Sequence, residues 1–93
     1  MNDRKIENKE LLLRLRKVEG QLRGIQDMIA NERYYLEIIY QLNAVQTATK
    51  NTAFILLERH LNECIENAKK SGNLDEEMNN IIIIFKQFTK YYR

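Results

Sequence analysis

The 93-residue chain has no proline, three glycines, one cysteine and one histidine. Proline and glycine interrupt helices, so their scarcity favours a few long helices over many short strands. A single cysteine excludes a disulfide framework and is typical of a protein in the reducing cytoplasm. No signal peptide is expected after Met1, and the longest apolar run, 81–85, is too short to span a bilayer. We therefore expect one cytoplasmic domain over residues 1–93, away from membranes.

The residue sets of common enzymes are also missing. There is no Ser/His/Asp set, no phosphate-binding loop, and no pair of carboxylates that a fold would obviously bring together. The chain is therefore predicted not to be an enzyme. Its net charge is only +2, which does not by itself indicate a nucleic-acid partner.

Helical periodicity covers nearly the whole chain and predicts an all-α protein of three helices, at about 6–30, 34–70 and 74–91. In the first helix, apolar residues recur at alternating spacings of four and three, as in a coiled-coil seam. The members of this seam are Leu11, Leu15, Val18, Leu22, Ile25 and Ile29. The second helix keeps apolar residues at helical spacing along most of its length.

The predicted boundaries differ in strength. Gly72 is a typical residue at a helix C-terminus. Asn73 is expected to cap the next helix, with Glu76 as its capping-box partner. The break at 31–33 is weaker, because no residue there forces a turn.

The run 81–85 could also form a buried strand, since β-branched residues favour strands. No partner strand is predicted elsewhere, so a helix that is apolar on most sides is favoured. Such a helix needs cover on more than one face. A monomer would leave a large apolar patch in water, so we predict a homodimer or homotetramer rather than a complex with another protein.

Basic residues gather in the first predicted helix, at Lys9, Arg14, Arg16, Lys17 and Arg23. Arg16 and Arg23 are seven apart and share an outer stripe, which Lys5 and Lys9 extend, whereas Arg14 and Lys17 flank the seam on the other side. Such a stripe can neutralise DNA phosphates. An ordinary solvated face is the alternative, and composition alone favours it. No helix-turn-helix or zinc-finger spacing is present, so DNA would be recognised through its backbone and shape.

His60 and Cys64, the only residues of their types, are four apart and share a face of the second helix. Imidazole and thiolate are good ligands for Cu(I), Zn(II) and Ni(II). Two ligands do not make a site, so a third group is required. The alternative is a partly buried histidine beside a small apolar cysteine.

Several segments resemble the CsoR/RcnR family of bacterial repressors. Residues 14–25 (RLRKVEGQLRGI) are similar to the family's first-helix signature, which 28–29 and 32–34 continue. Residues 41–46 (QLNAVQ) are similar to its second-helix segment, and 60–64 (HLNEC) to its sensor segment. The resemblance covers nearly the whole chain.

This resemblance implies a fold, an assembly and a function. Family members are three-helix protomers that pair into dimers through an antiparallel four-helix arrangement, and two dimers form a disc-shaped tetramer. The resemblance implies that the tetramer binds operator DNA through its basic surface and releases it when an inducer binds at the dimer interface.

In the family's copper sensors, a cysteine from one protomer meets a histidine and a cysteine from the other. By position, these residues correspond to Tyr35, His60 and Cys64, so the first cysteine is replaced by tyrosine. Tyr34 and Asn80 fall where copper sensors carry a tyrosine and a glutamate that support the ligands.

Because one thiol is replaced, several hypotheses stay open. A transition metal ion, Cu(I), Ni(II), Co(II) or Zn(II), could bind His60 and Cys64 with Tyr35 or another ligand. Cys64 alone could respond to an oxidant or electrophile, or the site could be silent. A small metal-binding protein without DNA binding and a purely structural helical oligomer are the alternatives from other classes.

Overall fold

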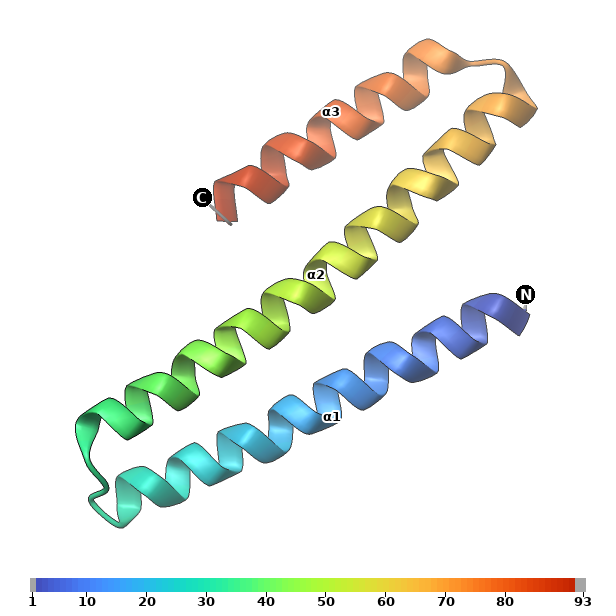
Figure 1. Cartoon of the computed structure of the whole chain (residues 1–93). Helices are drawn as coiled ribbons and strands as arrows, with labels where there is room; N and C mark the ends of the chain where they lie inside the picture. The colour runs from blue at the N-terminus through green and yellow to red at the C-terminus, as the bar shows by residue number, and fades with distance from the viewer. Residues whose placement is uncertain (1, 92–93) are drawn as a thin grey trace. The chain divides into compact units, whose positions relative to one another are not determined.

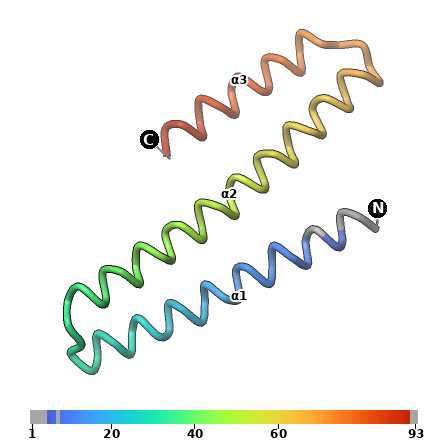
Figure 2. Tube along the Cα trace, in the orientation of Figure 1, coloured from blue at the N-terminus to red at the C-terminus, as the bar shows by residue number. Residues whose placement is uncertain are grey.

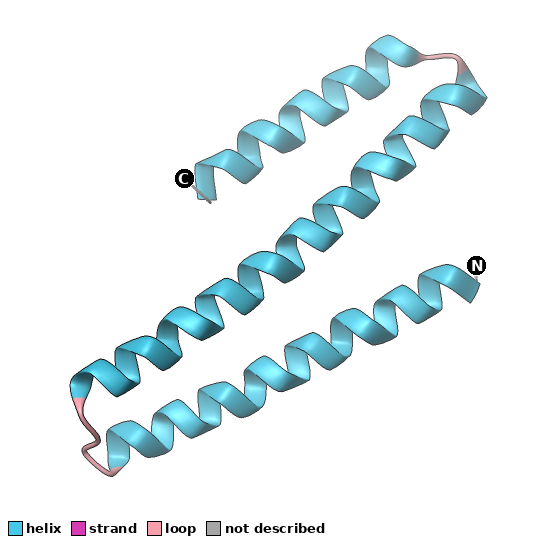
Figure 3. Cartoon of the chain, in the orientation of Figure 1, coloured by secondary structure: helices cyan, strands magenta, loops and turns pink. Residues whose placement is uncertain are grey.

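The computed structural model describes residues 2–91. Its described residues form helices joined by two short loops, with no strand among them (Figure 3). The helices are α1 (Asn2–Ala30), α2 (Tyr35–Ser71) and α3 (Leu74–Tyr91). The predicted three-helix fold is confirmed, with α1 beginning four residues earlier than expected. The run 81–85 lies within α3, so the helical interpretation of this segment is also confirmed.

The chain divides into two compact units, Met1–Thr52 and Ala53–Arg93. The first unit contains α1 and the beginning of α2, and the second contains the rest of α2 and α3 (Figures 1 and 2). Within each unit, the loop between the two helical segments reverses the chain, so the segments run antiparallel. The single domain over 1–93 stays a prediction.

In the first unit, α1 ends in a turn closed by two backbone hydrogen bonds. The Arg33 N–H donates to the Met28 carbonyl at 2.9 Å, and the Glu32 N–H donates to the Ile29 carbonyl at 3.1 Å. This is the Schellman arrangement, which requires a left-handed residue after the helix. Glu32 takes that conformation, with φ of 53°. The predicted break is therefore confirmed, although a glutamate stands where glycine is usual.

The seam of α1 separates into a buried line and an exposed line. Leu11, Val18 and Ile25, spaced seven apart, expose 7%, 6% and 4% of their surface. Leu15 and Leu22, which lie beside that line on the helix, expose 41% and 40%. The described chain therefore covers one side of the predicted seam and leaves the other side open.

In the second unit, the loop between α2 and α3 has the predicted caps. Gly72 has φ of +71°, in the left-handed region, and its N–H donates to the Ala68 carbonyl at 3.0 Å. The Glu76 N–H donates to Asn73 Oδ1 at 3.4 Å, and Asn73 Nδ2 donates to Glu76 Oε2 at 2.7 Å. The reciprocal pair is a variant of the capping box in which the carboxylate binds the side chain of the cap instead of its backbone.

Packing in the second unit is light. The rings of Phe54 on α2 and Phe88 on α3 lie 4.8 Å apart at an angle of 57°, a favourable tilted arrangement. No described residue of α3 is fully buried, and Ile82, Ile83 and Phe85 are exposed. The described chain therefore leaves much of the apolar surface of α3 uncovered, as the sequence predicts.

Candidate metal centre and nucleic-acid surface

The predicted sensor pair forms within one helix of the second unit. His60 and Cys64 lie one turn apart on α2, with 3.7 Å between His60 Nε2 and Cys64 Sγ. Only 4% of the surface of Cys64 is exposed, whereas half of the His60 side chain is exposed. The pair therefore combines a buried thiol with an imidazole that solvent can reach.

Negative groups surround the thiol. Burial raises the pKa of Cys64 above its ordinary value of 9.0, and the carboxylate of Glu77 raises it further by accepting a hydrogen bond and by its charge. Glu63 adds a smaller contribution in the same direction and lies 4.0 Å from His60, measured from Oε2 to Nδ1. These surroundings disfavour a free thiolate, which is the form that oxidants and electrophiles attack. They favour a bound cation, which would offset the negative charge.

The spacing of the pair fits a shared metal ion. With typical metal distances of about 2.0 Å to nitrogen and 2.3 Å to sulfur, donors 3.7 Å apart subtend an angle of about 119° at the ion. That angle lies between the tetrahedral and trigonal values, so both donors can bind one ion and leave a position open. Among residues 2–91, no group of three or more His, Cys, Asp or Glu side chains is placed to hold a metal. A third ligand must therefore be another type of residue, another chain or a small molecule.

The other residues predicted for this site lie on the surface. Tyr35 is the first residue of α2, belongs to the first unit and is 80% exposed, and Tyr34 precedes it in the loop at 65%. Their role beside the pair stays a prediction. Asn80 is exposed on α3, and the carboxylate that contacts Cys64 belongs to Glu77, about one turn earlier. Helical periodicity alone did not single out Glu77, because three consecutive acids, 75–77, begin this helix.

A cavity of about 350 Å³ lies beside the thiol, between α2 and α3 of the second unit. Its lining includes Cys64, Ile65 and Ala68 from α2, and Glu77, Met78 and Ile81 from α3. The walls are mostly apolar, with the thiol, one carboxylate, one thioether and the lysine side chain of Lys69 among them. The cavity therefore brings two sulfur-containing side chains to one space.

The predicted DNA contacts lie on the surface of α1. Lys9, Arg14, Arg16, Lys17 and Arg23 are all exposed. At 3.6 residues per turn, Lys9, Arg16 and Arg23 fall within about 40° of one another, roughly 160° around the helix from the buried line. Arg23 lies 3.9 Å from Glu19 in an exposed pair, which costs little to break. The three cations of the stripe therefore lie along one line of the helix, opposite its packed face.

No helix among the described residues has the length and apolar character needed to cross a membrane.

Known proteins resemble the chain along most of its length. The model of the family described as metal-sensitive transcriptional repressor matches residues 7–87. The copper-sensing transcriptional repressor CsoR of Bacillus subtilis (strain 168) is 44% identical over 84 residues, which cover 90% of this chain and 83% of that protein. The copper-sensing transcriptional repressor RicR of Mycobacterium tuberculosis (strain ATCC 25618 / H37Rv) is 42% identical over 59 residues, which cover 63% of this chain and 62% of that protein.

Two solved structures have the same fold. The nickel-responsive transcriptional regulator InrS matches with a TM-score of 0.81 and 32% identity, over 86% of this chain and 90% of that chain. The copper-sensing repressor CsoR with Cu(I) from Geobacillus thermodenitrificans NG80-2 matches with a TM-score of 0.78 and 35% identity, over 91% of this chain and 88% of that chain. These relatives are transcriptional regulators rather than enzymes. The chain therefore belongs to the family of metal-sensitive transcriptional repressors, as its resemblance to the CsoR/RcnR proteins implied.

Proposed function

We propose that this protein is a cytoplasmic repressor that binds operator DNA and releases it when a metal ion binds His60 and Cys64. The separation of 3.7 Å between His60 Nε2 and Cys64 Sγ is the observation that carries this proposal. It suits two ligands of one ion, in a chain whose relatives include copper-sensing and nickel-responsive regulators. Because one donor is a thiolate, a soft or borderline ion such as Cu(I), Ni(II), Co(II) or Zn(II) is expected.

The basic stripe of α1, together with Arg14 and Lys17 on the other side of the seam, is the proposed DNA surface. Five exposed cations on one helix supply the phosphate contacts that make binding strong and salt-dependent. Phosphate contacts set the position of the protein on DNA and carry little sequence information, so the shape of the operator would supply much of the specificity.

We further propose that the functional form is a homotetramer built from two dimers. The exposed line of the α1 seam and the exposed apolar residues of α3 support this assembly, since soluble proteins rarely leave such surfaces in water. In this arrangement, Tyr35 of a neighbouring copy is the residue that would approach His60 and Cys64. Its phenol is a harder donor than the thiolate it replaces, so it is expected to contribute little to binding a soft ion.

Fluorescence anisotropy with labelled DNA from the protein's own promoter tests the proposal. The wild type should bind this DNA at moderate salt more tightly than a scrambled duplex, and a metal ion should release it. His60→Ala and Cys64→Ala should bind the same DNA but resist release. No preference for the promoter, or release of both variants at the same metal concentration as the wild type, would contradict the proposed function.

A further inference from the structure

Positive charge gathers in a second place, at the end of the chain. Residues 78–93 contain three cations and no acid, in a chain with 15 cations and 13 acids. Without this segment the acids would outnumber the cations. Two of its cations, Lys86 and Lys90, lie on α3. We propose that they form a second phosphate-binding surface for operator DNA, in addition to the surface on α1. This inference rests on the proposed function, because it takes DNA to be a partner of the protein.

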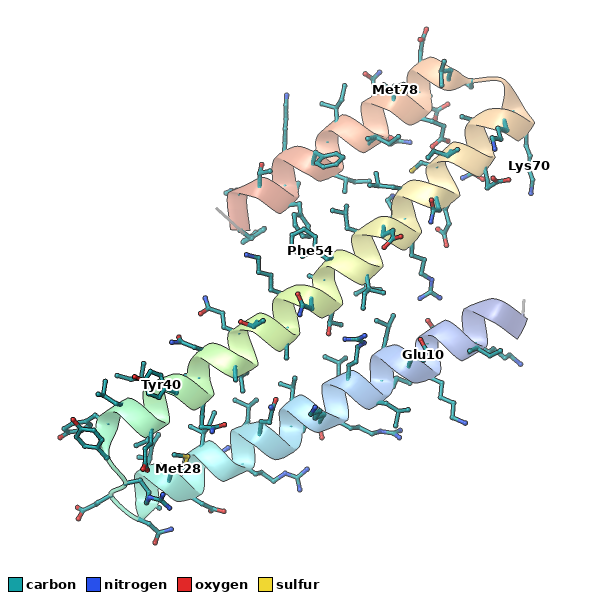
Figure 4. The ribbon with its side chains drawn as sticks, viewed as in Figure 1. Glu10, Met28, Tyr40, Phe54, Lys70 and Met78 are labelled. Atoms are coloured by element: carbon teal, nitrogen blue, oxygen red, sulfur yellow. The ribbon has the colours of Figure 1, made fainter. Side chains whose placement is uncertain are left out.

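The packing of α3 within the second unit turns both lysines away from α2. The rings of Phe88 and Phe54 lie 4.8 Å apart, so Phe88 marks the side of α3 that packs on α2. Figure 4 shows Phe54 on the side of α2 that faces α3. Lys86 and Lys90 lie two residues before and after Phe88, which places each about 160° around the helix from it. Both lysines are exposed and therefore share the outer side of the helix.

No internal carboxylate competes with DNA for these lysines. Neither Lys86 nor Lys90 has an ion-pair partner among residues 2–91. The acids of α3, at 75–77, all lie in its first turn. At 1.5 Å per residue, Glu77 is about 13 Å along the helix from Lys86. A phosphate can therefore bind either lysine without displacing a partner.

The alternative role of the lysines is to stabilise their own helix. Cations near a helix C-terminus interact favourably with the helix dipole, and Lys90 lies in the last turn of α3. This explanation is weaker for Lys86, which lies one turn earlier, because the effect of the dipole falls off beyond the last turn. The two roles predict different measurements. Phosphate contacts make affinity for DNA depend on salt, whereas a contribution from the dipole changes only stability.

Charge distribution along α3 also separates DNA from an anionic membrane as the partner. The helix exposes apolar residues and lysines together, which is a combination found in helices that lie on membranes. Such a helix places its whole length at the lipid surface, and anionic lipids would repel the acids at 75–77. A DNA strand can contact the basic end alone. Transcriptional repressors among the relatives support the same choice.

A salt series with the full-length protein and labelled promoter DNA tests the inference by fluorescence anisotropy. The double variant Lys86→Gln/Lys90→Gln should reduce the slope of log affinity against log salt concentration by about 1.8, or about 0.9 for each lost phosphate contact. Between about 50 and 200 mM salt, the wild type should therefore lose about tenfold more affinity than the variant. A scrambled duplex should show the same change, because phosphate contacts carry no sequence information.

Two control variants separate the charge of these lysines from other effects. Lys86→Arg/Lys90→Arg keeps both charges and should keep the slope of the wild type. Lys69→Gln removes an exposed cation of the same unit that pairs with Glu66 at 3.6 Å, and should also leave the slope unchanged. Thermal melts of every variant measure the contribution of the lysines to stability separately from DNA binding.

The outcomes distinguish this inference from the proposed function. If the folded double glutamine variant keeps the slope of the wild type, the inference is wrong, whether or not the melting temperature falls. The proposed function then stands if the wild type still prefers the promoter and a metal ion releases it. An equal loss of slope in the arginine variant would show that charge is not the cause and would also overturn the inference. An unchanged slope with lysine-dependent binding to phosphatidylglycerol vesicles would assign the surface to membranes instead.

Discussion

Alkylation of the only cysteine tests the environment of the candidate metal centre without any metal. Cys64 is the only thiol in the chain, so every adduct with iodoacetamide reports on this one position. The thiolate is the reactive form. The rate of alkylation therefore follows the fraction of Cys64 that is deprotonated, which burial, Glu77 and Glu63 reduce.

The magnitude follows from the direction of the pKa shift. The ordinary pKa of this thiol is 9.0, and every cause acting on it raises that value. At pH 7 the thiolate therefore makes up less than about 1% of the folded protein, and its population grows about tenfold per pH unit. The alkylation rate at pH 7 should be less than about a hundredth of the plateau rate at high pH, and burial should slow it further.

Mass spectrometry of the intact protein after timed quenching gives the rate at each pH. The chain unfolded in urea is the reference, and it should react faster at every pH because its thiol is exposed. Glu77→Gln removes the charged hydrogen-bond acceptor, so it should lower the pKa of Cys64 and speed alkylation at pH 7.5. The matched control is Glu66→Gln, which removes an exposed acid paired with Lys69 and should change little.

A rapid reaction at pH 7 whose rate does not rise between pH 7 and 9 would refute this reasoning. It would mean that Cys64 is already a thiolate in the folded protein, and it would favour the hypothesis of an oxidant or electrophile sensor.

Three other outcomes follow from the structure. Because the folded protein favours the neutral thiol, Cys64 contributes stability below pH 9.0 that is lost as pH rises through the higher folded pKa. Urea titrations should show the wild type losing stability relative to Cys64→Ala as pH rises above 9.0, and a constant difference would contradict the shift. Gly20→Ala should raise the free energy of unfolding by about 1 kcal/mol, because helix propensity improves and the added Cβ has no neighbour within 4 Å. Gly72→Ala should lower the free energy of unfolding by about 1–2 kcal/mol, because alanine does not favour the positive φ at this position. Melting temperatures that shift in the same direction for both variants would contradict this prediction. Arg16→Ala should reduce the slope of log affinity for DNA against log salt concentration by about 0.9 for each phosphate that the variant no longer neutralises. The control is Arg33→Ala, because the side chain of Arg33 lies outside the stripe and pairs with Glu37 at 3.0 Å. This variant should leave the slope unchanged if only the proposed DNA surfaces bind DNA.

Local rules in the sequence were enough to predict most of the helix ends. Gly72, Asn73 and Glu76 were recognisable as caps because each residue type has a specific backbone or hydrogen-bonding preference at its position. The turn at 31–33 was harder to explain, since Glu32 adopts a left-handed conformation that its side chain does not favour. The backbone hydrogen bonds that stabilise this turn depend on the folded geometry and leave no mark in composition.

The candidate site was predictable only in part. Helical spacing brought His60 and Cys64 together correctly, because residues four apart meet on one face. Which residue of α3 meets Cys64 depends on how two helices pack, and periodicity does not give their relative rotation. For this reason Glu77 and Met78 emerged from the structure, whereas Asn80 came from an alignment by resemblance.

The two faces of α1 also have an evolutionary consequence. Leu11, Val18 and Ile25 occupy the packed side, whereas Lys9, Arg16 and Arg23 occupy the opposite side. Substitutions among these cations alter no buried residue, and the proposed metal ligands lie in a different unit. If these cations bind the operator as proposed, selection can adjust the strength of that binding through single charge changes and leave the proposed sensor residues as they are. Related repressors could then diverge in the genes they control and keep their inducer.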